Sequence, residues 1–91
     1  MTQFAELCDL VAKDLETGGH TTEASEIRTL SDTAGDNSRP AAERVDALEQ
    51  VRMRCHVKWL GDIYLAHLSQ TEWWSRLEKL SKAARKLKQT V

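Results

Sequence analysis

The sequence predicts an all-α protein, a small antiparallel (up-down) bundle of four helices. Apolar residues recur every three or four positions over most of the chain, which is the period of a helix face. Turn and capping residues interrupt that period at three places and leave short connections, so consecutive helices should run antiparallel. One proline and four glycines in 91 residues leave few turns for a sandwich or a barrel.

The length of the chain is that of one domain, so we expect a single helical domain over residues 1–91. The four helices are expected over roughly residues 2–17, 22–34, 39–68 and 70–88.

The first helix is indicated by an apolar stripe with charged residues on its other face. The stripe comprises Phe4, Leu7, Cys8, Val11 and Leu15. Two glycines at 18–19 follow directly, and glycine adopts the left-handed conformation that ends many helices without steric cost. We therefore expect this helix to end at about residue 17.

The second helix is predicted from a narrower stripe that follows a cap at Thr21 or Thr22. The stripe comprises Ala24, Ile27, Leu30 and Ala34. A helix of about a dozen residues is marginal alone, so this one must be held by packing. The turn residues of 35–40 separate it from the third helix, with Pro40 suited to a first helical turn.

The third helix is expected to be the long central one, because residues 39–68 carry apolar residues on more than one face. A helix that is apolar nearly all round is normally buried, so Trp59, Leu60 and Ile63 should lie in the core. Gly61 is the one conflict in this pattern. We expect a tolerated interior glycine there, and the alternative is a division into helices of roughly 39–60 and 62–68.

The fourth helix has the clearest start signal in the chain. Ser69 and Glu72 have the spacing of a capping box, in which each side chain binds the backbone N–H of the other residue. The next apolar stripe has the 4-3-4-3 spacing of a helix packed along another at a shallow angle. It comprises Trp73, Leu77, Leu80, Ala84 and Leu87. With Leu48 of the third helix, Leu77 and Leu80 should be buried.

Charge is divided along the chain although its net value is −1. Residues 1–50 hold eleven acids and four bases, net −7, whereas residues 51–91 hold three acids and nine bases, net +6. Such asymmetry indicates either charged partners or pairing between acidic and basic helices of the bundle. Both interpretations stay open at this point.

The sequence favours neither an enzyme nor a cofactor or metal protein. It has no glycine-rich phosphate loop, and its three histidines and two cysteines lack the paired spacing of zinc ligands. No segment has the length of a membrane span, and the acidic N-terminus is unlike a signal peptide. We therefore expect a cytoplasmic protein without membrane contact, in which Cys8 and Cys55 are reduced core thiols rather than a disulfide.

Protein binding is the function that the sequence favours. We expect a stoichiometric role of the kind that small immunity proteins, antitoxins and inhibitors encoded by phages or mobile elements serve, with a basic surface on the partner. Exposed acids would steer association, and exposed aromatics would anchor the complex. The candidate acids are Glu16, Glu23, Glu26, Asp32 and Asp36, and the candidate anchors are Trp74 and Tyr64.

Nucleic-acid binding is the alternative, since the fourth helix carries six basic residues and could lie along phosphates. The candidate residues are Arg76, Lys79, Lys82, Arg85, Lys86 and Lys88. Against it stand the net charge of −1 and the lack of a recognisable reading helix. A homo-oligomeric scaffold is the third possibility.

Overall fold

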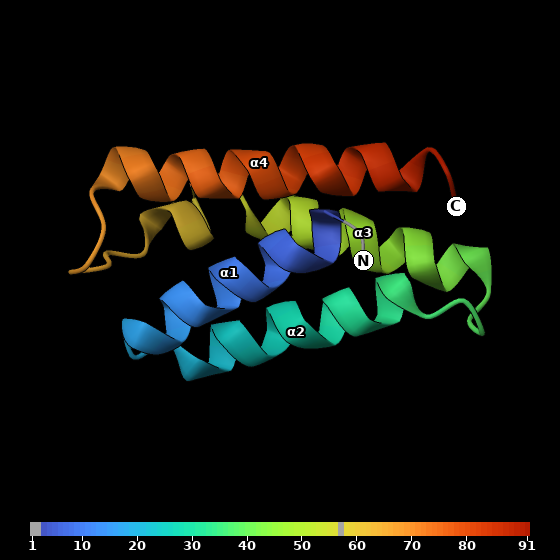
Figure 1. Cartoon of the computed structure of the whole chain (residues 1–91), viewed down its shortest axis with the longest axis horizontal. Coiled ribbons are helices and arrows are strands. Elements are labelled where there is room, and N and C mark those ends of the chain that lie inside the picture. The colour runs from blue at the N-terminus through green and yellow to red at the C-terminus, as the bar shows by residue number, and fades with distance from the viewer. Residues whose placement is uncertain (1–2, 57) are drawn as a thin grey trace.

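The computed structural model of the chain describes residues 3–56 and 58–91 and confirms the predicted fold class. Within these residues it contains four α-helices and one short 3₁₀ turn, and no strand (Figure 1). The elements are α1 (Gln3–Thr17), α2 (Thr21–Gly35), α3 (Ala41–Arg54), η1 (Leu60–Asp62) and α4 (Gln70–Lys88). None of the helices in the described ranges combines the length and the apolar character that crossing a membrane requires.

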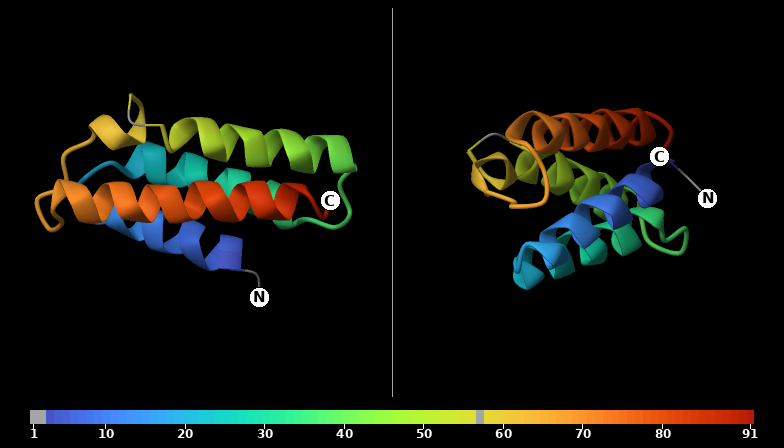
Figure 2. Two further views of the ribbon diagram at one scale, coloured as in Figure 1. Left: turned by 90° about the horizontal axis from the view of Figure 1, so that it is seen from above. Right: turned by 60° about the vertical axis from the view of Figure 1, so that its left-hand side comes forward.

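The helices form a compact bundle with extents of 38 × 23 × 20 Å. Each helix packs against the next one in the chain, and α1 also packs against α4, so the four helices surround one core. Figure 2 shows the α2–α3 connection at the same end as the C-terminus. The α1–α2 turn and the much longer connection between α3 and α4 lie at the opposite end.

The core is built from the predicted stripes. Val11 and Leu15 of α1, Leu48 of α3 and Leu80 of α4 have no exposed surface, and Leu77 is also buried. Leu60 is buried as expected, but Ile63 is only partly buried. Trp59 corrects the prediction, because 48% of its surface is exposed.

The end of α1 agrees with the glycine signal. The backbone N–H of Gly19 donates to the carbonyl of Glu16, and the N–H of His20 donates to that of Leu15 at 2.8 Å, which is the Schellman arrangement. Gly19 has a φ of +87°, a conformation that a side chain would strain. The helix therefore ends at Thr17 as predicted, while residue 2, its predicted first residue, lies outside the described residues.

The third helix corrects the prediction most strongly. It spans Ala41–Arg54 rather than 39–68, so the segment after Arg54 is neither a helix with an interior glycine nor two helices divided at Gly61. A helix of 30 residues would be roughly 45 Å long, longer than the whole bundle at 38 Å. The residues after Arg54 are also poor helix formers, with only Lys58 and Leu60 favourable between 55 and 64. The chain therefore turns back on the bundle.

The fourth helix begins and ends as predicted. The Ser69 hydroxyl accepts the backbone N–H of Glu72 at 3.1 Å, and the Glu72 carboxylate accepts that of Ser69 at 3.4 Å, so the capping box is present. Trp73, Leu77, Leu80 and Ala84 are buried along its inner face. Capping and packing agree here, which explains why the sequence predicted this element so well.

Candidate binding surface at the α3–α4 connection

Two consecutive tryptophans of α4 hold the connection between α3 and α4, residues 55–69. The indole N–H of Trp73 donates to the carbonyl of Leu60 at 2.8 Å, in the core. The indole N–H of Trp74 donates to the carbonyl of Gly61 at 3.0 Å, and the Gln70 side chain donates to the same oxygen at 2.8 Å. These bonds satisfy two carbonyls that a continuous third helix would have used internally. They thus fix the position of η1.

A second set of contacts ties the connection to α1. Asp14 is the one buried charged residue among those described, with 7% of its surface exposed. Its carboxylate accepts a hydrogen bond from Arg76 of α4 at 2.5 Å, and its other oxygen lies 3.0 Å from Nε2 of His67. Asp14 thus joins three parts of the bundle. No local sequence pattern indicates this cluster, because its members are 53 and 62 positions apart from Asp14.

Large apolar side chains are exposed around this connection. Met53, Trp59, Tyr64 and Trp74 expose 59%, 48%, 77% and 47% of their surfaces. Among the described residues, the only other large apolar side chain exposed is Leu10 of α1. The expectation that Trp74 and Tyr64 are exposed is therefore met, whereas the exposure of Met53 and Trp59 was not foreseen. We refer to Met53, Trp59, Tyr64 and Trp74 as the exposed apolar set.

A groove lies between the end of α3 and α4. It consists of two adjoining hollows of about 350 Å³ each, which share Cys55, His56 and Ser81. We call it the α3–α4 groove. Its remaining lining residues are Glu49, Arg52, Met53, Trp74, Leu77 and Glu78. The groove therefore brings two members of the exposed apolar set, Met53 and Trp74, to one concave surface.

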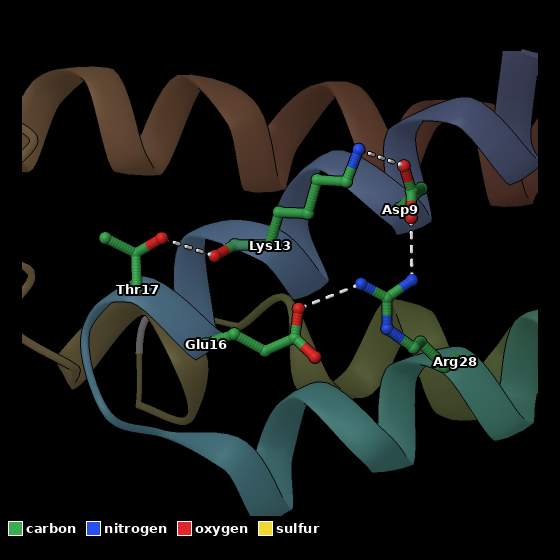
Figure 3. A network of polar contacts seen from close by, with 5 residues as sticks. All are labelled: Asp9, Lys13, Glu16, Thr17 and Arg28. Carbon is green, nitrogen blue, oxygen red and sulfur yellow. Dashed lines mark hydrogen bonds and ion pairs between the residues drawn. The ribbon is translucent and has the colours of Figure 1, made fainter.

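The predicted acidic surface is largely engaged within the chain. Glu16 pairs with Arg28 at 2.9 Å, and the same guanidinium binds Asp9 at 2.6 Å (Figure 3). Glu26 of α2 pairs with Arg54 at the end of α3. Asp36 accepts hydrogen bonds from the backbone and hydroxyl of Ser38 and pairs with Arg39 at 3.4 Å. Glu23 and Asp32 have no ion-pair partner among the described residues.

Hydrogen bonds shift the pKa values of several carboxyls downward. Arg28 and then Lys13 hold the pKa of Asp9 below its ordinary value, since both donate to the ionised form. The Ser38 hydroxyl and backbone N–H do the same to the pKa of Asp36. Lys88 lowers the pKa of Glu49 across the α3–α4 pair. These groups keep their charge over the neutral pH range as parts of intramolecular pairs.

Half of the predicted basic set is paired as well. Arg76 binds Asp14, Lys82 binds Glu78 at 3.1 Å and Lys88 binds Glu49. Lys79, Arg85 and Lys86 have no ion-pair partner in the part of the chain that the structure describes. Three acids of the N-terminal half, Asp14, Glu26 and Glu49, are thus bound by bases of the C-terminal half. Pairing inside the bundle accounts for part of the charge asymmetry.

Neither cysteine forms a disulfide, and both thiols are deactivated. Cys8 is buried in α1 and Cys55 is half-buried in the floor of the α3–α4 groove. Burial raises the pKa of each thiol to about 12, so both are protonated at neutral pH. A thiol in this state is a poor nucleophile and a poor metal ligand.

No group of three or more His, Cys, Asp or Glu side chains in the described ranges is placed to hold a metal ion. The conspicuous features of this end are apolar exposure, a groove and paired charges. Comparison with protein families, with curated proteins and with solved structures finds no match to this chain.

Proposed function

We propose that this chain is a non-catalytic protein-binding module that binds its partner through the exposed apolar set. The observation that carries the proposal is that Met53, Trp59, Tyr64 and Trp74 are exposed in or next to the α3–α4 connection, while the residues of the apolar stripes are buried or partly buried. Clustered exposed apolar side chains mark interaction sites in small proteins. Tryptophan and tyrosine are also enriched among the residues that dominate binding energy.

The contacts that hold two of these aromatic rings support the same proposal. The Trp74 ring is held by its bond to the Gly61 carbonyl, and the Arg54 guanidinium lies 5.2 Å from the centroid of the Trp59 ring. Arg54 is itself held by Glu26 of α2. Side chains that are already fixed lose little conformational entropy on binding, so more of the contact energy appears as affinity.

Within this function, we propose a stoichiometric inhibitor of the immunity-protein or antitoxin kind, acting in the cytoplasm. The small size of the bundle, with extents of 38 × 23 × 20 Å, accords with such a role. Two free thiols accord with a reducing compartment. Of the acids predicted to steer a basic partner, Glu23 and Asp32 remain available, while Glu16, Glu26 and Asp36 are engaged. We therefore assign anchoring to the aromatics and only a minor share of steering to the acids.

Co-purification from the native host tests this proposal. The wild-type chain should recover one protein at a one-to-one ratio. A double variant, Trp59→Ala with Tyr64→Ala, should lose it, because both side chains are exposed and neither is part of the core. Leu10→Ala is the matched control, since Leu10 is also an exposed apolar residue but lies on α1. Retention of the partner by the double variant would refute the assigned surface.

Nucleic-acid binding remains the second candidate function, because Lys79, Arg85 and Lys86 are unpaired within the described ranges. Recovery of RNA or DNA instead of a protein would favour it. Binding through these residues should weaken by orders of magnitude between low and physiological salt. A complex that survives physiological salt would instead agree with anchoring by the exposed apolar set.

A further inference from the structure

We infer that the α3–α4 groove receives an amphipathic helix of the partner protein that carries acidic residues beside its apolar face. The inference rests on the proposed function and names the partner's chemistry. It reverses the sign of the charge that the sequence led us to expect on the partner. The shape, the floor and the charge of the groove support it in turn.

The shape of the groove is set by two helix faces. Trp74, Glu78 and Ser81 line the α4 wall at spacings of four and three, so they share one face of that helix. Arg85 continues the same face one turn further on. The opposite wall comes from the last turns of α3 and from His56. A channel between two helices has the form into which an amphipathic helix lays its apolar side.

The floor of the groove is apolar. Leu77 is buried with 2% of its surface exposed, and burial also accounts for the raised pKa of the Cys55 thiol, about 12. The Trp74 ring and the Met53 side chain stand exposed at its rim. Methionine adapts its shape to different apolar partners, and tryptophan supplies a large rigid contact. An apolar stripe of a partner helix therefore finds matching side chains along the groove.

Of the lining residues, Glu49 and Glu78 are acidic and Arg52 is basic, so the positive charge near the groove comes from bases beside its lining. Glu49 is bound both by Lys88 and by Arg52, the latter at 3.2 Å, so one acid neutralises only one of two bases.

The second acid of the groove is neutralised as well, since Glu78 is bound by Lys82. Arg85 then adds a base that has no ion-pair partner among the described residues. Carboxylates on the flank of the incoming helix would meet Arg52 and Arg85, whereas lysines there would be repelled.

A displayed library of amphipathic helical peptides tests the inference. Apolar residues are fixed at positions i, i+3, i+4 and i+7, and each flanking position is drawn equally from Glu, Lys and Gln. Selection on the wild-type chain should enrich Glu at the flanks. A counter-selection on Ser81→Trp, whose indole would fill the groove at a residue lining both hollows, should lose these peptides.

Charge variants on α4 provide a test that does not depend on Ser81→Trp. Arg85→Glu should weaken binding of a selected peptide about tenfold or more, and Lys79→Glu should change it by no more than about twofold. Both residues are exposed and unpaired in the described structure, undergo the same charge reversal and line neither hollow. Arg85 lies one turn beyond Ser81 on the groove face of α4, whereas Lys79 lies on another face of that helix. Equal effects of the two variants would overturn the inference.

The remaining outcomes separate this inference from the proposed function. Enrichment of Lys at the flanks, or failure to enrich any peptide, would overturn the inference that the groove binds an acidic helix. Selected peptides whose amide-shift changes map to Trp59 and Tyr64 rather than to Trp74 and Ser81 would also overturn it, while leaving the protein-binding function in place. Co-purification of nucleic acid in place of protein would refute both.

Discussion

Gly18 and Leu65 lie so close together that a Cβ on residue 18 would be 2.4 Å from Cδ2 of Leu65. Leu65 is buried, with 3% of its surface exposed, because the α3–α4 connection packs on the end of α1 at this point. The two adjacent glycines thus have different roles. Gly19 provides the left-handed backbone that ends α1, and Gly18 provides the space that the connection occupies.

Gly18→Ala should therefore destabilise the fold by about 1–3 kcal/mol, since the new methyl group must displace the buried Leu65 side chain. Urea unfolding measures the change. Gly35→Ala is the matched control, because a Cβ there meets nothing within 4 Å and the residue belongs to a helix. The control should be neutral or stabilising by about 0.4–1 kcal/mol. Equal stabilities of the two variants would show that the connection does not pack on Gly18.

Trp73→Phe and Trp74→Phe should differ in cost although each removes one indole N–H. The Trp73 bond to Leu60 is buried, so water cannot replace it, and its loss leaves the Leu60 carbonyl only the backbone N–H of Ile63 at 3.1 Å. The cost should be about 1–3 kcal/mol. Trp74 is 47% exposed, so water can replace its bond, and the cost should be about 0.5–1.5 kcal/mol. Thermal and urea unfolding of both variants provide the measurement. A larger loss of stability for Trp74→Phe than for Trp73→Phe would contradict the placement of Trp73 in the core and of Trp74 at the surface.

The contrast between these tryptophans and the third helix shows what the sequence could and could not predict. The stripes of α1, α2 and α4 and the capping box at Ser69 are local patterns, and the structure confirms them. The position of η1 depends on bonds from Trp73 and Trp74 to carbonyls 13 residues away, which no local sequence pattern records. The apolar residues after Arg54 could therefore be mistaken for a continuing helix, and Trp59 for a core residue.

Asp14→Asn should lower stability by about 1–3 kcal/mol, because the substitution removes the charge that Arg76 and His67 meet. The expected loss is modest for a buried ion because Arg76 and His67 remain about one-third exposed, at 30% and 33%. Asp32→Asn is the matched control, since Asp32 is exposed and unpaired in the described structure. Urea unfolding should show a lower free energy of unfolding for Asp14→Asn only. A decrease of the same size in both variants would show that the contacts of Asp14 with Arg76 and His67 do not stabilise the fold.

Stability should fall on the acid side of the pH range. The pKa values of Asp9, Asp36 and Glu49 are lower in the folded chain than their ordinary values of 3.8, 3.8 and 4.5, chiefly because of Arg28, Ser38 and Lys88 respectively. The stabilisation is therefore present above pH 4.5 and is lost as the pH falls through the lowered values. Urea unfolding at a series of pH values measures this dependence. Asp9→Asn should flatten it, and a wild-type stability independent of pH in this window would contradict the pairing.

Ion pairs between helices also explain why the sequence predicted the acidic surface only in part. The positions of Glu16 and Glu26 outside the apolar stripes correctly indicated that they are not core residues. Whether such an acid can bind a partner protein depends on the side chains of the neighbouring helix. Here Glu16 pairs with Arg28, and Glu26 pairs with Arg54. Charge reversal of these two acids would place lysine beside arginine and disturb the fold. Glu23→Lys is the cleaner test of the acidic surface, since Glu23 is unpaired within the described residues.

Both thiols should react slowly with a disulfide reagent at neutral pH. Their raised pKa values, about 12, leave almost no thiolate, and Cys8 is buried with only 1% of its surface exposed. Denaturant should accelerate the modification of Cys8 in step with unfolding. Cys8→Ser, which isolates Cys55, and Cys55→Ser, which isolates Cys8, assign the two rates. Fast labelling of Cys8 in the native chain would contradict its place in the core.

Backbone hydrogen–deuterium exchange, measured on the chain alone and in complex with the co-purified protein, tests most directly which surface binds. We predict slower exchange in the complex at the end of α3, around Trp59 to Tyr64 and in the first turns of α4, with the rest of the bundle unchanged. These segments carry the exposed apolar set and the α3–α4 groove. Protection centred on Glu23 and Asp32 of α2, with the α3–α4 end exchanging as in the free chain, would contradict the assignment.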